Sequence, residues 1–251
     1  MPVWDSVASA IRDATQRPFT VSRTSSVGGG SINEAYRLEG IDGTRYFVKL
    51  NEARHLAMFV AEIEGLKAIA STHTIHAPSP VTYGTFGGTS FLVLEHLELG
   101  SHGNAKLLGE QLAALHRCTG KHFGFNQDNF IGTTPQPNGW KESWIDFWRE
   151  HRLSFQLRLA AENGYGSELQ RLGEKLITAL PRFFDDYAPQ PSLLHGDLWG
   201  GNHTYLKDGL PTIFDPAAYY GDRECDLAMT ELFGGYAGDF YSAYRNVYPL
   251  D

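Results

Sequence analysis

The segment with the most chemical content is the string His195-Gly-Asp-Leu-Trp-Gly-Gly-Asn202, which an apolar strand separates from a second carboxylate, Asp215. Asp197 precedes Asn202 by five residues and Asp215 by eighteen. Transfer of a phosphoryl group from a nucleotide needs one carboxylate that orients a hydroxyl and accepts its proton. It also needs an amide oxygen and a second carboxylate that hold Mg²⁺ against the phosphates. An isolated His-Gly-Asp triplet is usually a structural turn, but the full string between strands indicates phosphoryl transfer.

Three consecutive glycines, Gly28, Gly29 and Gly30, are followed by Ser31 between two predicted strands. Because glycine has no Cβ, such a turn lets backbone N–H groups approach phosphate oxygens. The spacing matches neither G-x-x-x-x-G-K-[ST] nor G-x-G-x-x-G, which excludes a Walker A loop, a Rossmann fingerprint and the glycine-rich loop of protein kinases. By itself a triple glycine is more often a flexible hairpin.

A lysine, Lys49, lies within the apolar strand Tyr46-Phe-Val-Lys-Leu50, one hairpin after the glycines. This is the placement of a strand lysine that contacts the α- and β-phosphates of a nucleotide. The alternative is an exposed lysine on an edge strand. The next helix offers Glu62 and Glu64 as partners. We favour Glu62, because it lies beside the apolar face of that helix, four residues before Leu66.

The apolar run from Leu92 ends in Glu95, His96 and Leu97, where the first half of the chain meets the second. Backbone donors and acceptors at such a junction are suited to pairing with an adenine. This assignment rests on position and not on side-chain chemistry.

The first 97 residues must position the glycines, the lysine and its glutamate. Alternating and helical patterns of apolar residues define these elements. In chain order we expect a helix over residues 3–15, strands over 19–24, 35–38 and 45–50, a hairpin turn at 40–43, a helix over 55–70 and a strand over 89–94. This half is therefore predicted to be a small sheet with helical cover.

The rest of the chain is mostly helical in pattern, and Asn104 is a plausible N-cap for its first helix. In chain order we expect a helix around 108–115, a long ordered loop over 123–139, helices over 144–159 and 169–184, a loop–strand–turn–strand unit over 193–215, and a helical stretch over 228–240 broken at Gly234-Gly235. The candidate catalytic string thus lies in the loop that precedes two short strands.

The composition of the 251 residues limits the possible partners. With 21 basic and 29 acidic residues the net charge is −8, which excludes general attraction to nucleic acid or anionic membranes. Cys118 and Cys225 are too few for a disulfide framework and are expected to be reduced thiols. No apolar run approaches the ~18 residues needed to cross a bilayer, and no signal peptide is evident. We expect a cytoplasmic protein without nucleic-acid or membrane partners, and monomer or homodimer stays undecided.

On these motifs the sequence resembles the fructosamine kinase (ketosamine-3-kinase) family, in the aminoglycoside-phosphotransferase-like branch of the protein-kinase-like fold. The matching segments span nearly the whole chain and are residues 28–33, 47–51, 61–66, 94–97, 128–138, 194–202 and 214–229. The His-Gly-Asp triplet marks only the broad superfamily. The Thr-Pro-Gln-Pro-Asn loop (134–138) and the Trp-Gly-Gly-Asn segment (199–202) are much more specific to the ketosamine kinases.

The resemblance implies an α+β fold with two lobes around one active site. Residues 1–97 would form a nucleotide-binding N-lobe, a small antiparallel sheet plus one helix. Residues 98–251 would form a mainly helical C-lobe for catalysis and substrate binding. The implied activity is the phosphorylation, dependent on ATP and Mg²⁺, of a sugar hydroxyl in a ketosamine, a sugar attached to an amine. The ketosamine would be a free adduct or part of a glycated protein.

Residue by residue, the resemblance makes Asp197 the catalytic base, Asn202 and Asp215 the Mg²⁺ ligands, and Lys49 the phosphate contact. His195 would support the loop by hydrogen bonding and would not itself take a proton. The further cofactor-binding residues are Gly28, Gly29, Gly30, Ser31, Glu62 and the adenine hinge of Glu95, His96 and Leu97.

Two departures from the family pattern stand out. Some relatives carry a cysteine in the glycine-rich turn, where this chain has Ser31, so redox control through that turn is not expected. The chain also stops at Tyr248-Pro-Leu-Asp251, where relatives continue into further helices. We therefore expect a C-lobe that is shortened or incomplete.

The substrate side is predicted from charge. The secondary amine of a ketosamine is protonated near neutral pH, and a cation favours an acidic, aromatic pocket. Trp199 lies in the catalytic string, and Asp222 and Glu224 follow Asp215, so we expect these three side chains to face the sugar-amine. The alternative is structural, with Asp226 bracing the metal loop and the nearby tyrosines in the core.

Two other functions compete with a ketosamine kinase. One keeps the fold and changes the acceptor to an aminoglycoside, choline or another amino-alcohol. The other is a nucleotide-binding pseudokinase that acts as an interaction module, which the presence of Lys49, Asp197, Asn202 and Asp215 argues against. A Ser/Thr protein kinase is disfavoured because proline follows Asp215 and no Ala-Pro-Glu segment is present. The preferred ketosamine, and a role in repair or in catabolism, stay open.

Overall fold

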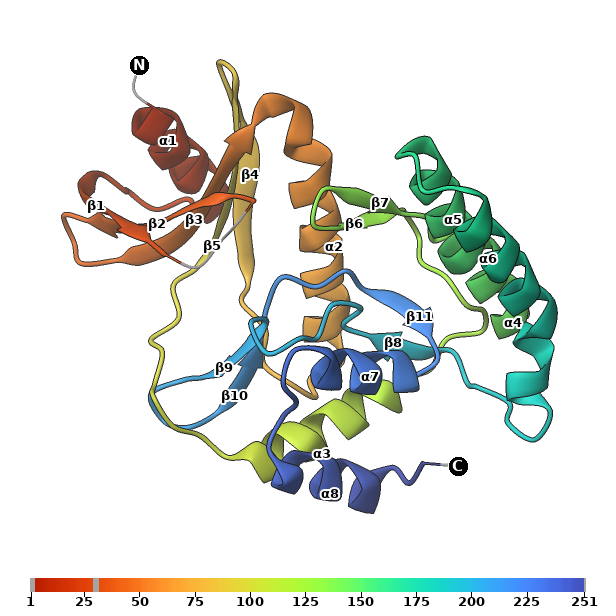
Figure 1. Ribbon diagram of the computed structural model, residues 1–251. Coiled ribbons are helices and arrows are strands. Elements are labelled where there is room, and N and C mark those ends of the chain that lie inside the picture. The colour runs from red at the N-terminus through yellow and green to blue at the C-terminus, as the bar shows by residue number, and fades with distance from the viewer. Residues whose placement is uncertain (1–2, 29–31, 251) are drawn as a thin grey trace.

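The computed structural model describes residues 3–28 and 32–250, and its N-terminal part is an antiparallel sheet flanked by two helices (Figure 1). The sheet has five strands in the order β1-β2-β3-β5-β4. These strands are β1 (Val21–Val27), β2 (Glu34–Gly40), β3 (Arg45–Glu52), β4 (Pro80–Phe86) and β5 (Thr89–Glu95). The helices are α1 (Val3–Thr15) and α2 (Leu56–Ser71), and a 3₁₀ turn (Ala53–His55) precedes α2. The family resemblance implied one helix in this part of the chain. The described residues form two, because the helix predicted over residues 3–15 is also present.

Alternation along β3 decides which way Lys49 points. Val48 and Leu50 are buried in a core that they share with Val7 and Ile11 of α1. Successive side chains of a strand project to opposite faces, so Lys49 lies on the other face of the sheet. This is the face that α2 covers, and Lys49 forms an ion pair with that helix.

The C-terminal part is mainly helical. Its helices are α3 (Ala105–His116), α4 (Trp144–Trp148), α5 (Ser154–Glu162), α6 (Ser167–Ala179), α7 (Glu224–Leu232) and α8 (Gly238–Val247). As predicted, Asn104 caps α3, because its side-chain oxygen accepts a hydrogen bond from the backbone N–H of Leu107 at 3.1 Å. The predicted break at Gly234-Gly235 separates α7 from α8, and both glycines have positive φ.

One hydrophobic core joins the two parts. Phe59 and Leu66 of α2 lie in the same buried cluster as Leu112 of α3 and Phe240 of α8. Each of these side chains is at most 1% exposed. Helix α2 is therefore anchored to the C-terminal part as well as to the sheet.

Short strand pairs hold the loops of the C-terminal part. They are β6 (Asn129–Ile131) with β7 (Thr134–Gln136), β8 (Ser192–Leu194) with β11 (Tyr219–Gly221), and β9 (His203–Tyr205) with β10 (Pro211–Ile213). Strand β8 ends immediately before His195, β9 begins immediately after Asn202, and β10 ends two residues before Asp215. The candidate catalytic residues therefore lie where short strands begin and end.

The structure differs from the sequence-based expectation in three segments. The loop predicted over 123–139 contains the β6–β7 hairpin, whose strands are too short to show periodicity. The long helix predicted from Trp144 contains a π-helical turn, Arg149–Leu153, between α4 and α5. The helix predicted to reach Phe184 is α-helical only to Ala179 and ends as a 3₁₀ segment, because Pro181 has no N–H to donate.

The structure also describes the two cysteines and the apolar character of the helices. Cys118 and Cys225 are both free cysteines. Within residues 3–28 and 32–250, no helix combines the length and the apolar character that crossing a membrane requires.

The close approach of α3 to α8 generates a stability prediction. A Cβ added at Gly109 would lie 2.2 Å from the carbonyl oxygen of Phe240, so the helices must separate. We expect Gly109→Ala to lower the free energy of unfolding by about 1–3 kcal/mol through overpacking. The measurement is urea unfolding followed by circular dichroism.

The matched control for this change is Gly88→Ala, in the turn between β4 and β5, where an added Cβ meets no atom within 4 Å. We expect the control to change the free energy of unfolding by less than about 0.5 kcal/mol. Equal stability of the two variants would contradict the packing described for α3 and α8.

Candidate active site

Asp197 and Asn202 face each other across the loop between β8 and β9. The Asn202 Nδ2 atom donates hydrogen bonds to the backbone oxygen of Asp197 at 2.8 Å and to its Oδ2 atom at 3.1 Å. Because both partners are oxygens, the amide nitrogen must point to Asp197 and the Asn202 Oδ1 atom points away. Asn202 therefore orients the Asp197 carboxylate and keeps an oxygen for a cation.

The Asp197 carboxylate lies in an environment that suits a proton acceptor. Burial raises its pKa to about 6, the hydrogen bond from Asn202 opposes this change, and the negative charges of Asp215 and Asp226 reinforce it. A carboxylate with a pKa near 6 is still ionised at neutral pH and is more basic than an exposed aspartate. This combination favours general-base chemistry on a weakly acidic hydroxyl.

His195 is held as a neutral ring. Its Nε2 atom lies 2.9 Å from the carbonyl oxygen of Phe214, so this nitrogen carries the proton and donates. Its Nδ1 atom accepts from the backbone N–H of Asp197 at 3.3 Å. Burial lowers the pKa of His195 although Asp226 acts in the opposite direction. As expected from the sequence, the ring supports the loop, and both of its nitrogens are engaged in doing so.

Asp226, at the start of α7, fixes the backbone of the same loop. Its two carboxylate oxygens accept hydrogen bonds from the backbone N–H groups of His195 (2.7 Å) and Gly196 (2.9 Å). The sequence suggested that Asp226 braces the metal loop. In the structure the segment that Asp226 holds directly is the catalytic loop. Gly196 has φ +83°, and an added Cβ would lie 2.1 Å from the carbonyl oxygen of Ala217, so this position requires glycine.

A buried histidine and a tyrosine extend this brace. The His116 Nε2 atom lies 3.1 Å from Asp226 Oδ2, and its Nδ1 atom lies 2.8 Å from the hydroxyl oxygen of Tyr244. His116 is fully buried and Asp226 is 1% exposed. The chain Tyr244–His116–Asp226 thus connects α8 and α3 to the catalytic loop through α7.

Lys49 joins the sheet, α2 and the loop after β10. Its Nζ atom lies 2.7 Å from Glu62 Oε1 and 2.5 Å from Asp215 Oδ1. The predicted pairing with Glu62 is therefore present. Burial alone would lower the pKa of Lys49, but the charges of Asp215 and Glu62 outweigh it and hold that pKa above its usual value. Lys49 is accordingly a permanent cation.

Asp215 lies in a tightly packed turn beside Asn202. Its φ is +59°, an uncommon conformation for a residue other than glycine. The preceding residue, Phe214, donates its backbone N–H to the carbonyl oxygen of Asn202 at 3.1 Å. The following residue, Pro216, packs against α2, where an added Cβ at Gly65 would meet its Cγ at 3.1 Å. Asn202 and Asp215 are thus brought onto neighbouring backbone segments.

This donor set suits Mg²⁺ bound together with phosphates. In the part of the chain that the structure describes, no group of three or more His, Cys, Asp or Glu side chains is arranged to hold a metal ion alone. Mg²⁺ commonly binds through one or two protein oxygens, several waters and the substrate phosphates. The Oδ1 atom of Asn202 and the carboxylate of Asp215 match that requirement.

The residues predicted to face the nucleotide include the glycine-rich turn after β1, of which the structure describes Gly28. Gly28 is exposed at the end of β1, and after the turn Asn33 is tied to β3 by a 2.6 Å hydrogen bond from Asn51. The other predicted residues of the turn lie outside the described residues: Gly29, Gly30 and Ser31.

The hinge candidates lie at the end of β5, where Glu95 is the last strand residue and His96 and Leu97 follow it. The side chain of Glu95 turns back to accept the backbone N–H of Ser79 at 2.9 Å, which leaves the hinge role to the backbone of Glu95, His96 and Leu97.

The predicted substrate residues occupy different surroundings. Trp199 is 40% exposed and forms a T-shaped ring contact with Phe233, which is 70% exposed. Asp222 is 6% exposed and accepts hydrogen bonds from the Tyr187 hydroxyl (2.9 Å) and the backbone N–H of Glu224 (3.0 Å). This carboxylate is thus buried and used at the start of α7, and the expectation that Asp222 faces a sugar-amine stays a prediction. Glu224 is half-buried at the first position of that helix.

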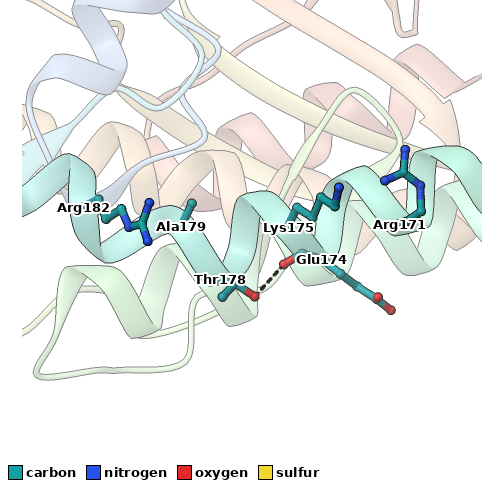
Figure 2. Close-up of a pocket in the computed structure, with 6 residues that line it drawn as sticks. All are labelled: Arg171, Glu174, Lys175, Thr178, Ala179 and Arg182. Atoms are coloured by element: carbon teal, nitrogen blue, oxygen red, sulfur yellow. Dashed lines mark hydrogen bonds between the residues drawn. The ribbon is translucent and has the colours of Figure 1, made fainter.

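A separate cavity of about 490 Å³ lies on α6 and the segment that follows it, and Figure 2 shows the basic side chains that dominate it. Its lining residues are Arg171, Glu174, Lys175, Thr178, Ala179 and Arg182. None of them is a predicted site residue, so this cavity is distinct from the candidate active site.

Sequence reasoning did not identify His116 or Tyr244. His116 lies four residues after Leu112 and eight after Leu108, on the apolar face of α3. A histidine on a buried helix face needs hydrogen-bond partners, so the position of His116 on the apolar face indicated that its ring is hydrogen-bonded. The partner Tyr244 lies 128 residues away in the sequence, so the pairing itself could not be derived.

Comparisons with known proteins identify the family of this chain. A family model described as fructosamine kinase matches residues 3–251. A ketoamine kinase homologue from Synechocystis sp. is 46% identical over 252 residues, which cover 99% of this chain and 84% of that protein. A chloroplastic protein-ribulosamine 3-kinase of Arabidopsis thaliana is 42% identical over 233 residues, which cover 91% of this chain and 71% of the plant protein.

The fold is similar to that of a solved relative. The crystal structure of a fructosamine-3-kinase homologue from Haemophilus somnus superposes with a TM-score of 0.90. The two chains are 30% identical, and the match covers 99% of this chain and 83% of the other. The α+β, protein-kinase-like architecture is thereby shown for this chain.

The contacts of Asp226 lead to a second prediction. In Asp226→Asn, one oxygen becomes an NH₂ group that faces a donor, so a buried N–H of the catalytic loop loses its acceptor. We expect the free energy of unfolding to fall by about 1–3 kcal/mol. Because Asp197 is displaced with the loop, we also expect turnover to fall by about 100-fold. Urea unfolding and steady-state kinetics measure the two effects.

Asp239→Asn is the matched control, because Asp239 is 69% exposed and lies 3.9 Å from an exposed lysine. It should change the free energy of unfolding by less than about 0.5 kcal/mol. If both variants kept wild-type turnover, Asp226 would not position the catalytic loop.

Proposed function

This chain belongs to the fructosamine kinase family, and from that premise we propose that it transfers the γ-phosphoryl group of ATP, with Mg²⁺, to a sugar hydroxyl of a ketosamine. Membership of the family makes it a ketosamine kinase, an enzyme that phosphorylates an alcohol group. The individual roles of its residues, the nucleotide and the metal are the subject of the proposal.

One observation carries the assignment of the site. Lys49, Glu62 and Asp215 form a continuous ion-pair cluster, and Asp215 lies beside the hydrogen-bonded pair Asp197–Asn202. In this arrangement Asp197 suits the phosphoryl acceptor and Lys49 suits the phosphate chain of a nucleotide. Asn202 and Asp215 suit a cation. The oriented amide of Asn202 beside the partly buried Asp197 carboxylate, whose pKa burial raises, supports a catalytic use of this arrangement.

In the proposed reaction Asp197 accepts the proton of the sugar hydroxyl as that oxygen attacks phosphorus. Its pKa of about 6 fits this role at neutral pH. Asn202 holds the Asp197 carboxylate in place through its Nδ2 atom, and His195 fixes the loop backbone. Lys49, kept in position by Glu62, binds phosphate oxygens and orients the leaving group.

Mg²⁺ would be held by the Oδ1 atom of Asn202 and the carboxylate of Asp215, together with nucleotide phosphates. When bound, it supplies positive charge that stabilises the negative charge developing on the transferred phosphoryl group.

The N-lobe, residues 1–97, would bind the nucleotide between the glycine-rich turn of Gly28, Gly29, Gly30 and Ser31 and the hinge of Glu95, His96 and Leu97. The C-lobe, residues 98–251, would supply the catalytic and acceptor residues.

The acceptor is proposed to lie on Trp199. This exposed ring stands two residues after Asp197, so its face can contact a sugar or a protonated amine next to the base. Glu224, half-buried at the first position of α7, stays a candidate for the amine. Two free thiols suit a reducing compartment, which supports the cytoplasm as the location.

The proposed activity is tested by ADP release with Mg·ATP over a panel of acceptors. The panel contains fructosyl-lysine, ribulosyl-lysine, psicosyl-lysine, an aminoglycoside and choline. We expect turnover with at least one ketosamine and none with choline or the aminoglycoside. Absence of ketosamine-dependent turnover by folded protein, or a clear preference for the aminoglycoside, would overturn the proposal.

The role of Asp197 gives a prediction with two readouts. Asp197→Asn keeps the shape of the side chain and removes its basicity, so turnover should fall by about 10²–10⁴-fold. Nucleotide affinity, measured by calorimetry, should stay close to wild type because Asp197 contacts the acceptor and not the nucleotide. Asp186→Asn, on the exposed segment after α6, serves as the control and should keep full activity. Near-wild-type turnover of Asp197→Asn would rule out Asp197 as the base.

A further inference from the structure

The β6–β7 hairpin carries two buried amide side chains that the proposed reaction does not use. Asn129 and Gln136 are cross-strand partners in this hairpin and are 3% and 7% exposed. The second of them belongs to the Thr-Pro-Gln-Pro-Asn segment that the sequence resemblance singles out. Burying an amide is unfavourable unless it is hydrogen-bonded, so the partners of these side chains indicate what the hairpin does.

Both amides are aimed at the backbone that follows Asp215. Asn129 donates from Nδ2 to the carbonyl oxygen of Ala218 at 2.8 Å. Gln136 donates from Nε2 to the carbonyl oxygen of Ala217 at 3.2 Å and to Oδ1 of Asn129 at 2.7 Å. The two side chains therefore form one unit that binds two consecutive carbonyl groups, two and three residues after Asp215.

The backbone at Ala217 is held from two sides. Its N–H donates to the carbonyl oxygen of His195 in the catalytic loop at 2.9 Å, while its own carbonyl oxygen accepts from Gln136. Asp215, two residues earlier, has φ +59°, a conformation that persists only when its surroundings impose it. The hairpin therefore supports the backbone at Ala217 from the side opposite the catalytic loop.

The tip of the same hairpin reaches the segment that joins β1 to β2. A Cβ added at Gly132 would lie 3.4 Å from the Cδ1 atom of Ile32, which follows the glycine-rich turn. In Figure 1 the hairpin lies beside α2, between the sheet and α5. The hairpin therefore spans from the backbone next to Asp215 to the end of the turn proposed to bind phosphates.

We propose that Asn129 and Gln136 are positioning residues that fix the Asp215 carboxylate for metal-dependent nucleotide binding, so that the β6–β7 hairpin is a working part of the site. The inference rests on the proposed function, because it assigns Asp215 to the metal. It concerns residues that touch neither the acceptor nor the cation and that act through the backbone of Ala217 and Ala218.

The test replaces the donor without changing the length of the side chain. Methionine has the same length as glutamine from Cβ to the last heavy atom but has no amide group. Gln136→Met therefore removes both hydrogen bonds that Nε2 donates, to Asn129 and to Ala217. The readout is the affinity for AMP-PNP, measured by calorimetry with and without Mg²⁺, alongside kcat. We expect the gain in affinity that Mg²⁺ gives to fall by about 10- to 100-fold, as for other residues that orient a metal ligand. Metal-free affinity should stay within about twofold of wild type.

Gln170→Met is the matched control. Gln170 also donates from Nε2 to a backbone carbonyl, that of Leu157 at 2.9 Å, but this contact joins α6 to α5. Loss of this bond should leave the Mg²⁺-dependent gain within about twofold of wild type. Circular dichroism confirms that each variant is folded. If Gln136→Met does not fold, Gln136→Asn provides the second variant, because it retains an amide on a shorter side chain.

The outcomes separate this inference from the proposed function. A folded Gln136 variant whose Mg²⁺-dependent gain equals that of wild type would overturn the inference. So would a parallel loss of metal-free and metal-dependent affinity, which indicates a general structural role. If the wild-type protein binds Mg·AMP-PNP but phosphorylates no ketosamine, the proposed function fails while the binding test of the hairpin still applies.

Discussion

The carboxylate of Asp226 accepts two backbone N–H groups of the catalytic loop and a ring nitrogen of His116, and the rest of the site depends on this interaction. A carboxylate that is 1% exposed is tolerated only when its oxygens are hydrogen-bonded. Because those partners lie on the loop and on α3, the charge of Asp226 fixes the loop against the helical core. The left-handed turn at Gly196 then presents Asp197 next to Asn202.

The second constraint is the position of Asp215. The catalytic loop holds the backbone at Ala217, the hairpin holds the same residue from the other side, and Lys49 contacts the carboxylate itself. Lys49 reaches this place because alternation along β3 directs it to the face covered by α2, where Glu62 compensates its charge. Helix α2 packs on the sheet and shares one buried cluster with helices of the C-terminal part, so it links the nucleotide-facing residues to the catalytic ones.

Much of this arrangement follows from the sequence where a pattern is long enough to be periodic. Helices α1 and α2, the hairpin of β2 and β3, the N-cap at Asn104 and the pairing of Lys49 with Glu62 were all derivable. The β6–β7 hairpin was not, because three-residue strands stabilised by buried amides show no apolar alternation. The hydrogen bond from Tyr187 to Asp222 was not derivable either, because an acidic side chain in the sequence does not reveal a hydroxyl partner 35 residues away. The catalytic and cofactor roles of the individual residues stay predictions.

In the proposed reaction Asp197 activates a sugar hydroxyl for attack on the γ-phosphorus of ATP. Phosphorus NMR of a reaction with Mg·ATP and a ketosamine observes this step directly. We expect a new phosphomonoester resonance, coupled to a proton of the sugar, that grows as ADP forms and that grows far more slowly with Asp197→Asn. Formation of inorganic phosphate alone, or the same phosphomonoester made at an undiminished rate by the variant, would contradict it.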